Sequence, residues 1–178
     1  IEASGQSGTG NAEGASASRA ISRFMATCDA RIMIQTHTVA KVAIEAMMRY
    51  ARPNINESEL EGIFDFALMK QGVRQHAFES IVAGGARATT LHYKENNCTV
   101  EDGQLVLIDL GSAESNYCAD ISRTFPINGK FTDRQKELFT IVREAMEHSK
   151  DKMRPGVPVR EAQQAVLDFY KKALRTAK

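Results

Sequence analysis

The most apolar run of the sequence contains a carboxylate. Residues 105–110 are apolar except for Asp109 in the fifth position. A strand that is apolar on both faces is expected to be covered on both sides. An ionised carboxylate inside such a strand costs several kcal/mol unless a positive group compensates it. Asp109 is therefore predicted either to end its strand or to belong to a site that holds a positive charge.

A second aspartate, Asp120, follows eleven positions after Asp109. If residues 105–110 and 116–125 form a hairpin whose turn centres on residues 114–115, the two aspartates face each other directly. Like charges in directly opposed positions destabilise a strand pair. One divalent cation, or two, would convert this repulsion into coordination. The hairpin therefore predicts a metal site on one face of the sheet.

A local interpretation of the two aspartates competes with the metal site. Asp109 can end its strand and accept hydrogen bonds from a turn at Gly111. Asp120 can pair with Arg123 or cap a bend. Two aspartates alone leave both interpretations open, because the register of a hairpin depends on the length of its turn.

Apolar periodicity predicts helices before and after the strands in the sequence. From residue 19 to Tyr50, apolar side chains recur at steps of three and four, which predicts a long amphipathic helix that Pro53 ends. Residues 77–83 are predicted to form another strand. Two capping boxes predict the starts of further helices, Asn56 with Glu59 and Thr132 with Gln135. Pro158 suits the start of a last helix.

Residues 1–18 contain few side chains that could fill a core. Twelve of the 18 are Gly, Ser or Ala, which predicts a disordered tail or linker. An echo also appears along the chain, because Arg52-Pro53 recurs 102 positions later as Arg154-Pro155. This echo is either a coincidence at helix ends or the trace of a duplicated helix and strand unit.

Charge and cysteine content limit the function classes. The chain has 23 basic and 22 acidic residues, so neither nucleic acid nor an anionic membrane is expected as a partner. The sequence contains no run of about 18 uncharged apolar residues, so no membrane helix is predicted. The three cysteines cannot all pair with one another, which indicates free thiols in a reducing compartment. A cytoplasmic location is expected, with a mitochondrial one left open.

His92 is the histidine with the clearest catalytic potential. It lies in a polar loop after Gly84 and Gly85, which are expected to make the loop mobile. A histidine in such a loop is more often a surface residue than a catalytic one. The other three are predicted to be solvated or structural: His37, His76 and His148. Neither the cysteines nor the glycines have a spacing that predicts thiol or nucleotide chemistry.

Three segments around these residues resemble one enzyme family. They are Thr90-Leu91-His92-Tyr93 with Asn96, residues 102–111, and residues 117–132. They resemble the aminopeptidase P and prolidase branch of the pita-bread metallopeptidases, and the resemblance covers about residues 20–178. It implies an α+β pita-bread fold, with helices packed on a curved antiparallel sheet. Residues 19–178 would be the N-terminal half of the catalytic domain.

The resemblance also implies roles for the three site residues. Asp109 and Asp120 match two of the five ligands of a centre with two divalent metal ions, with manganese expected and cobalt or zinc as alternatives. His92 matches a catalytic residue that also binds substrate. The other ligands, one His and two Glu, are expected beyond residue 178. The chain alone is therefore expected to be inactive.

The implied reaction is hydrolysis of the N-terminal Xaa-Pro peptide bond by metal-activated water. The partner would be a peptide with proline in its second position, and the protein would form a homodimer. One alternative is a prolidase-type dipeptidase, and another is an inactive pita-bread module that binds peptides or proteins. The compact Leu91-His92-Tyr93 segment favours aminopeptidase P. Both aspartates are present, which speaks against the inactive module.

Overall fold

The computed structural model describes residues 10–176, with side chains from residue 26 onward. The chain forms two compact units. The first ends at Asn128, and the second begins at Gly129. All three residues that are predicted to form the site lie in the first unit.

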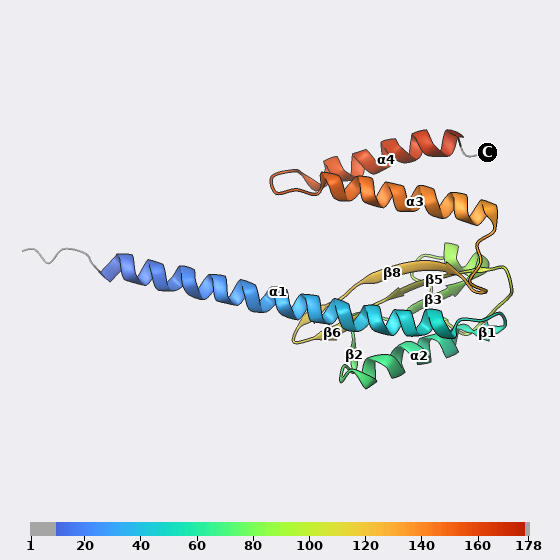
Figure 1. The fold of residues 1–178 in the computed structure, drawn as a ribbon, viewed down its shortest axis with the longest axis horizontal. Helices are drawn as coiled ribbons and strands as arrows, with labels where there is room; N and C mark the ends of the chain where they lie inside the picture. The colour runs from blue at the N-terminus through green and yellow to red at the C-terminus, as the bar shows by residue number, and fades with distance from the viewer. Residues whose placement is uncertain (1–9, 177–178) are drawn as a thin grey trace, which may run out of the picture. The chain divides into compact units, whose positions relative to one another are not determined.

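A long helix, α1 (Gly10–Tyr50), opens the first unit. The C-terminal part of α1 and the helix α2 (Glu57–Lys70) pack on one face of the central sheet (Figure 1). α1 ends before Pro53, as predicted. The residue before a proline is driven out of the helical conformation, which explains this end.

α1 begins earlier than the composition predicts. Residues 10–18 are helical, so the prediction of a disordered tail over residues 1–18 is wrong for this part. Residues 1–9 lie outside the described residues. Alanine is the best helix former, serine costs only about 0.5 kcal/mol more, and each added residue contributes one hydrogen bond to an existing helix. Small side chains therefore do not prevent a helix here.

The central sheet contains three antiparallel strands in the order β3, β5, β8. They are β3 (Ile81–Gly84), β5 (Leu105–Leu110) and β8 (Ile121–Pro126). β5 has the predicted bounds. β3 begins later than the predicted strand at residues 77–83, because its neighbour β5 offers pairing partners only to residues 81–84.

Burial alternates along β5. Val106, Ile108 and Leu110 are fully buried under the helices, whereas Asp109 lies on the opposite, half-buried face. The prediction that β5 is covered on both faces is therefore wrong. The second face meets only a small cluster of apolar residues, which includes Ile81, Ala83 and Tyr93. Asp109 consequently keeps more solvent contact than a strand buried on both faces would allow.

Two smaller sheets flank the central one. β1 (Ile55–Asn56) pairs with β4 (Thr99–Val100), and β6 (Ser112–Glu114) lies between β2 (Gln75–His76) and β7 (Tyr117–Cys118).

The turn between β6 and β7 consists of Ser115 and Asn116, with φ angles of 51° and 67°. Two such residues form a two-residue hairpin turn, in which asparagine is favoured. Glu114 pairs with Tyr117 across this turn. The turn therefore lies one residue later than predicted.

α2 begins with the predicted capping box. The Asn56 side chain accepts a 2.9 Å hydrogen bond from the Ser58 N–H, and Glu59 accepts a 3.3 Å hydrogen bond from the Asn56 N–H. The buried face of the helix carries Leu60, Phe64 and Leu68. This capping box fixes the direction in which the chain enters α2.

The second unit is a pair of packed helices, α3 (Asp133–Lys152) and α4 (Val159–Thr176). The predicted capping box of Thr132 and Gln135 begins α3. α4 begins immediately after Pro158, as predicted.

The helix boundaries also follow the echo in the sequence. Tyr50 and Lys152, which end α1 and α3, are 102 residues apart. The starts of α2 and α4, Glu57 and Val159, have the same separation. This agreement favours a duplicated unit. In the described range, residues 10–176, no helix combines the length and the apolar character needed to cross a membrane.

Candidate active site

Asp109 is oriented by a serine on the neighbouring strand. The register of β5 and β8 places Asp109 opposite Ser122. The Ser122 hydroxyl donates a 2.7 Å hydrogen bond to Oδ1 of Asp109. The prediction that Asp120 faces Asp109 directly is therefore wrong, because the hairpin turn lies one residue later and shifts the pairing by two positions.

Asp120 still interacts with Asp109. It lies two residues before Ser122, and side chains two apart in an extended segment share a face. Partial burial raises the pKa of Asp120, and the charge of Asp109 and a hydrogen bond with it raise this pKa further. The charge of His37 acts in the opposite direction. The two carboxylates are thus close enough for Asp109 to disfavour the ionised form of Asp120.

The register continues through Gly111. Leu110 pairs with Ile121 on one side, and Ala113 pairs with Cys118 on the other. Between them, Gly111 falls opposite Asp120. A Cβ atom added to Gly111 would lie 2.0 Å from the carbonyl oxygen of Ala119. The backbone next to Asp120 therefore requires glycine at this position.

A hollow of about 310 Å³ brings together the three predicted site residues. Asp109, Asp120 and His92 all line it, together with Phe78, Glu79, Ile81 and Lys94. Glu79 and Lys94 form an ion pair with each other. Phe78 and Ile81 add an apolar part to the wall. The hollow thus combines three carboxylates, an imidazole and an apolar surface.

The local interpretation of Asp120 receives no support from Arg123. Arg123 donates a 2.7 Å hydrogen bond to the carbonyl oxygen of Ser122. Among the described side chains, no ion pair joins Arg123 to Asp120. The charge of Asp120 is consequently not compensated by the neighbour that the sequence suggests.

The loop of His92 is tied down rather than loosely connected. Residues 85–89 form a short 3-10 helix, η1 (Gly85–Thr89). Beyond η1, the side chains of Tyr93 and Asn96 are buried. His92 itself has a φ of 53° and an exposed side chain. The short helix and the two buried side chains therefore conflict with the predicted mobility of the loop.

The other histidines have contacts within their own elements or units. His37 on α1 bonds to the Met33 carbonyl oxygen at 2.9 Å, although its charge also reaches Asp120. His76 lies 3.0 Å from Asp65. In the second unit, His148 packs on a phenylalanine of α4. His37, which the sequence pattern assigns to a solvated face, therefore lies near the candidate site.

The donor set fits a divalent cation but does not complete its coordination. Hard divalent cations prefer carboxylate oxygens, and a bound cation would oppose the burial and the charge of Asp109 that raise the pKa of Asp120. Among the described residues, no group of three or more His, Cys, Asp or Glu side chains could hold a metal ion. Asp109 and Asp120 alone are therefore too few to hold a metal ion, and a metal site built on them would need further ligands.

Comparison with known families identifies the family of the chain. The sequence model of Metallopeptidase family M24 matches residues 31–177. The chain belongs to metallopeptidase family M24. It is 41% identical over 123 residues to the Xaa-Pro aminopeptidase of Escherichia coli. This match covers 69% of this chain and 28% of that protein. The Xaa-Pro aminopeptidase of Haemophilus influenzae is 36% identical over 137 residues, which cover 77% of this chain and 32% of that protein.

Solved structures of M24 enzymes share the fold of the chain. An Escherichia coli aminopeptidase P in complex with substrate superposes with a TM-score of 0.74 and 36% identity, over 80% of this chain and 33% of that one. A protein assigned as aminopeptidase P from Bacillus anthracis reaches a TM-score of 0.80 at 36% identity, over 82% and 35%. The predicted family and its pita-bread fold are confirmed. The chain spans about a third of the length of these relatives.

Proposed function

We propose that the protein containing this chain is a metal-dependent aminopeptidase that hydrolyses the N-terminal Xaa-Pro bond of peptides. The observation that carries this proposal is the shared hollow of Asp109, Asp120 and His92. The relatives from Escherichia coli and Haemophilus influenzae are Xaa-Pro aminopeptidases. Because the chain covers only part of each relative, the activity belongs to the whole protein.

Asp109 and Asp120 would hold the metal. We propose two divalent ions, with manganese first and cobalt or zinc as alternatives; one structure of the Escherichia coli enzyme is a zinc-substituted form. Such ions lower the pKa of bound water and polarise a substrate carbonyl. Ser122 fixes the rotation of the Asp109 carboxylate through its 2.7 Å hydrogen bond. An oriented carboxylate binds a metal better than a mobile one.

His92 would contact the substrate next to the scissile bond. Its side chain is exposed and lines the hollow that contains both aspartates. An imidazole can donate or accept a hydrogen bond, and it can move a proton to or from a reacting group. We therefore assign His92 to substrate binding and catalysis, outside the set of metal ligands.

The apolar wall of the hollow suits a proline ring. Phe78 and Ile81 line the hollow beside the two aspartates. Proline has no backbone N–H and a fixed φ, so it demands no acceptor where another residue would need one. The apolar part of the wall can therefore contact a proline ring without leaving an N–H unpaired, which favours Xaa-Pro over other bonds.

Two carboxylates are too few for a two-metal centre. We propose that one His and two Glu from a second half of the fold, beyond residue 178, complete it. The isolated chain would then bind metal weakly and leave Xaa-Pro peptides intact. A cytoplasmic location and a homodimer stay predictions.

Three substrates separate this proposal from its alternatives. The full-length protein, loaded with manganese, would be tested on a tripeptide with proline in second position, on an Xaa-Pro dipeptide, and on the tripeptide with alanine in place of proline. Cleavage of the first peptide well above the third supports the proposal. Cleavage of the dipeptide alone indicates a prolidase. Metal binding without cleavage of any peptide indicates a peptide-binding module.

A further inference from the structure

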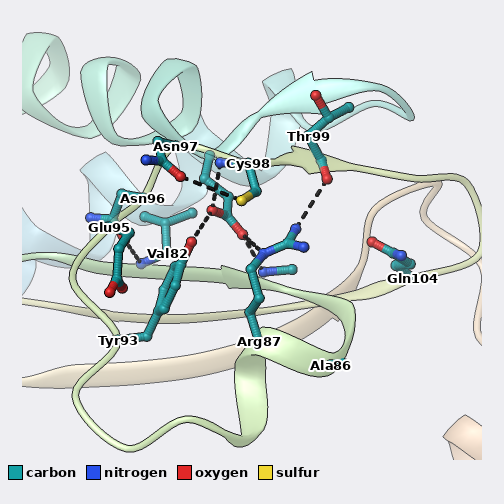
Figure 2. A network of polar contacts seen from close by, with 12 residues as sticks. Val82, Ala86, Arg87, Tyr93, Glu95, Asn96, Asn97, Cys98, Thr99 and Gln104 are labelled. Atoms are coloured by element: carbon teal, nitrogen blue, oxygen red, sulfur yellow. Dashed lines mark hydrogen bonds and ion pairs between the residues drawn. The ribbon is translucent and has the colours of Figure 1, made fainter.

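A buried carboxylate joins four parts of the loop that carries His92. Glu57, the first residue of α2, is completely buried. Its Oε1 accepts hydrogen bonds from the Gly84 N–H (2.8 Å) and from Nε of Arg87 (2.7 Å). Its Oε2 accepts from the Tyr93 hydroxyl (2.8 Å) and from the Cys98 N–H (3.0 Å). Arg87 and Tyr93 extend from the loop toward Cys98 (Figure 2).

The Glu57 carboxylate is ionised and fully bonded. A carboxylate has about four sites for hydrogen bonds, and all four are used here. Burial raises the pKa of Glu57, but the hydrogen bonds from Gly84, Arg87, Cys98 and Tyr93 together bring it below its ordinary value of 4.5. Such a carboxylate is strongly attached to its donors, because each lost hydrogen bond would leave a buried charge less compensated.

The four donors span the whole loop from residue 84 to residue 98. Gly84 lies at its start, Arg87 in η1, Tyr93 in its middle and Cys98 at its end. Arg87 also donates a 3.0 Å hydrogen bond to the Thr99 carbonyl oxygen, which links η1 to β4. Glu57 therefore contacts the loop at its start, in η1, in its middle and at its end.

His92 depends on this loop for its position. Among the described side chains, the His92 imidazole has no hydrogen-bond partner, so only its backbone holds it in place. That backbone has a φ of 53°, a left-handed conformation that is uncommon outside glycine and persists where the surroundings enforce it. The adjacent Tyr93 is only 6% exposed and is bonded to Glu57. Tyr93 is thus the anchor next to His92.

A second contact ties the same loop to the strand beside Asp109. The Asn96 side chain accepts a 2.9 Å hydrogen bond from the Val82 N–H and donates one of 2.8 Å to the Ser80 carbonyl oxygen. Val82 belongs to β3, in which Ile81 pairs with Asp109. The loop of His92 and the strand of Asp109 are therefore held against the same strand, β3.

We propose that Glu57 and Tyr93 are positioning residues that hold His92 at the hollow of the two aspartates. Neither touches the hollow itself, so both act through the backbone of the loop. The kinetic part of this proposal rests on the proposed function. Its structural part, the fixed position of His92, does not.

A double-mutant cycle tests the kinetic part in the full-length, metal-loaded protein. Tyr93→Phe keeps the ring and removes only the hydroxyl that bonds to Glu57. A misplacement of about 1 Å can cost about 10²-fold in rate, so we expect kcat for an Xaa-Pro peptide to fall about 10- to 100-fold with unchanged metal content. In the His92→Ala background the same substitution should have no further effect. An equal loss in both backgrounds would overturn the proposal.

An NMR measurement tests the structural part without any activity. We expect relaxation of the His92 ring signals to show greater motion in Tyr93→Phe, while the signals of His148 stay unchanged. Tyr50→Phe, at an exposed tyrosine, is the matched control and should change neither. Unchanged motion of His92 in a folded Tyr93→Phe protein would refute the positioning role. Absence of peptide cleavage in the wild type would instead refute the proposed function and leave this readout intact.

Discussion

Ser122 lies opposite Asp109 in the β5–β8 pair, and its hydroxyl donates a 2.7 Å hydrogen bond to Oδ1 of Asp109. A serine hydroxyl in this position can stabilise the Asp109 carboxylate through a hydrogen bond. Because the hydroxyl is neutral, it does not compete with a metal ion for the carboxylate as a positively charged side chain would. Asp120 lies two residues before Ser122, so its side chain is on the same face as that of Ser122. Ser122 thus adds a neutral donor beside the two aspartates of the candidate site.

Ser122→Ala should weaken metal binding without unfolding the protein. The substitution removes the group that orients Asp109, and the loss of such an outer partner typically costs about 10- to 100-fold in metal affinity. The free energy of unfolding should fall by only about 1 kcal/mol, because Asp109 is half-buried and water can replace the donor. Titration of the metal-free, full-length protein with Mn²⁺ measures the affinity. Ser115→Ala, on the exposed turn, is the control, and equal affinities of the two variants would contradict the role of Ser122.

Gly111→Ala should destabilise the first unit. The new Cβ would meet the Ala119 carbonyl oxygen at 2.0 Å, so the backbone beside Asp120 must move. We expect a loss of about 1–3 kcal/mol in the free energy of unfolding, measured by denaturant titration. Gly62→Ala provides the contrast, because it lies inside α2 with open space around its Cβ position and should stabilise by about 0.5–1 kcal/mol. Equal effects of the two substitutions would contradict the close approach at Gly111.

Glu57→Gln should destabilise the protein in a pH-dependent manner. The substitution leaves Arg87 without its buried partner, so we expect a loss of about 3–5 kcal/mol at pH 7. Folding lowers the pKa of Glu57 from its ordinary value of 4.5. Its contribution to the free energy of unfolding is therefore present above pH 4.5 and is lost as the pH falls through the folded pKa. The difference between wild type and variant should therefore shrink below pH 4.5. A difference that does not depend on pH would show that Glu57 acts without its charge.

Glu59→Gln is the matched control for Glu57→Gln. Glu59 lies two residues further along α2, is 54% exposed and pairs with Arg52 at 3.2 Å. An exposed ion pair contributes at most about 1 kcal/mol. We therefore expect a small effect of Glu59→Gln at every pH.

His92→Ala should reduce the rate of peptide hydrolysis by about 10²- to 10⁴-fold, as the loss of a proton-transfer or electrostatic group does. Metal content should stay near that of the wild type, because His92 is assigned to the substrate. His148→Ala, in the second unit, should leave the rate unchanged. Metal analysis beside the kinetic assay checks both expectations. Loss of metal from His92→Ala would make His92 a ligand and refute its role.

The sequence predicts the local features of the fold better than its pairings. The capping boxes and the bounds of β5 depend on residues close together in the chain, and the structure confirms them. The register opposite Asp109 depends on the turn at Ser115 and Asn116. A turn one residue later moves the partner of Asp109 from Asp120 to Ser122.

The Glu57 network illustrates what a sequence pattern does not contain. Glu57 resembles any acidic residue in the first turn of a helix, where such residues are common. Its four donors lie 27 to 41 positions away in the chain, and only tertiary structure brings them together. The signal available in the sequence is the acidic residue directly after the cap Asn56, which is too common to predict a buried charge.

The central claim is that Asp109 and Asp120 hold the metal ions that Xaa-Pro hydrolysis requires. The most direct test measures bound metal and hydrolysis of a tripeptide with proline in second position on the same samples of full-length protein. The samples are wild type, Asp120→Asn and, as a control on α3, Asp151→Asn. We predict two divalent ions and full activity in wild type and Asp151→Asn, and loss of both metal and activity in Asp120→Asn. Full metal content and wild-type turnover in Asp120→Asn would contradict the claim.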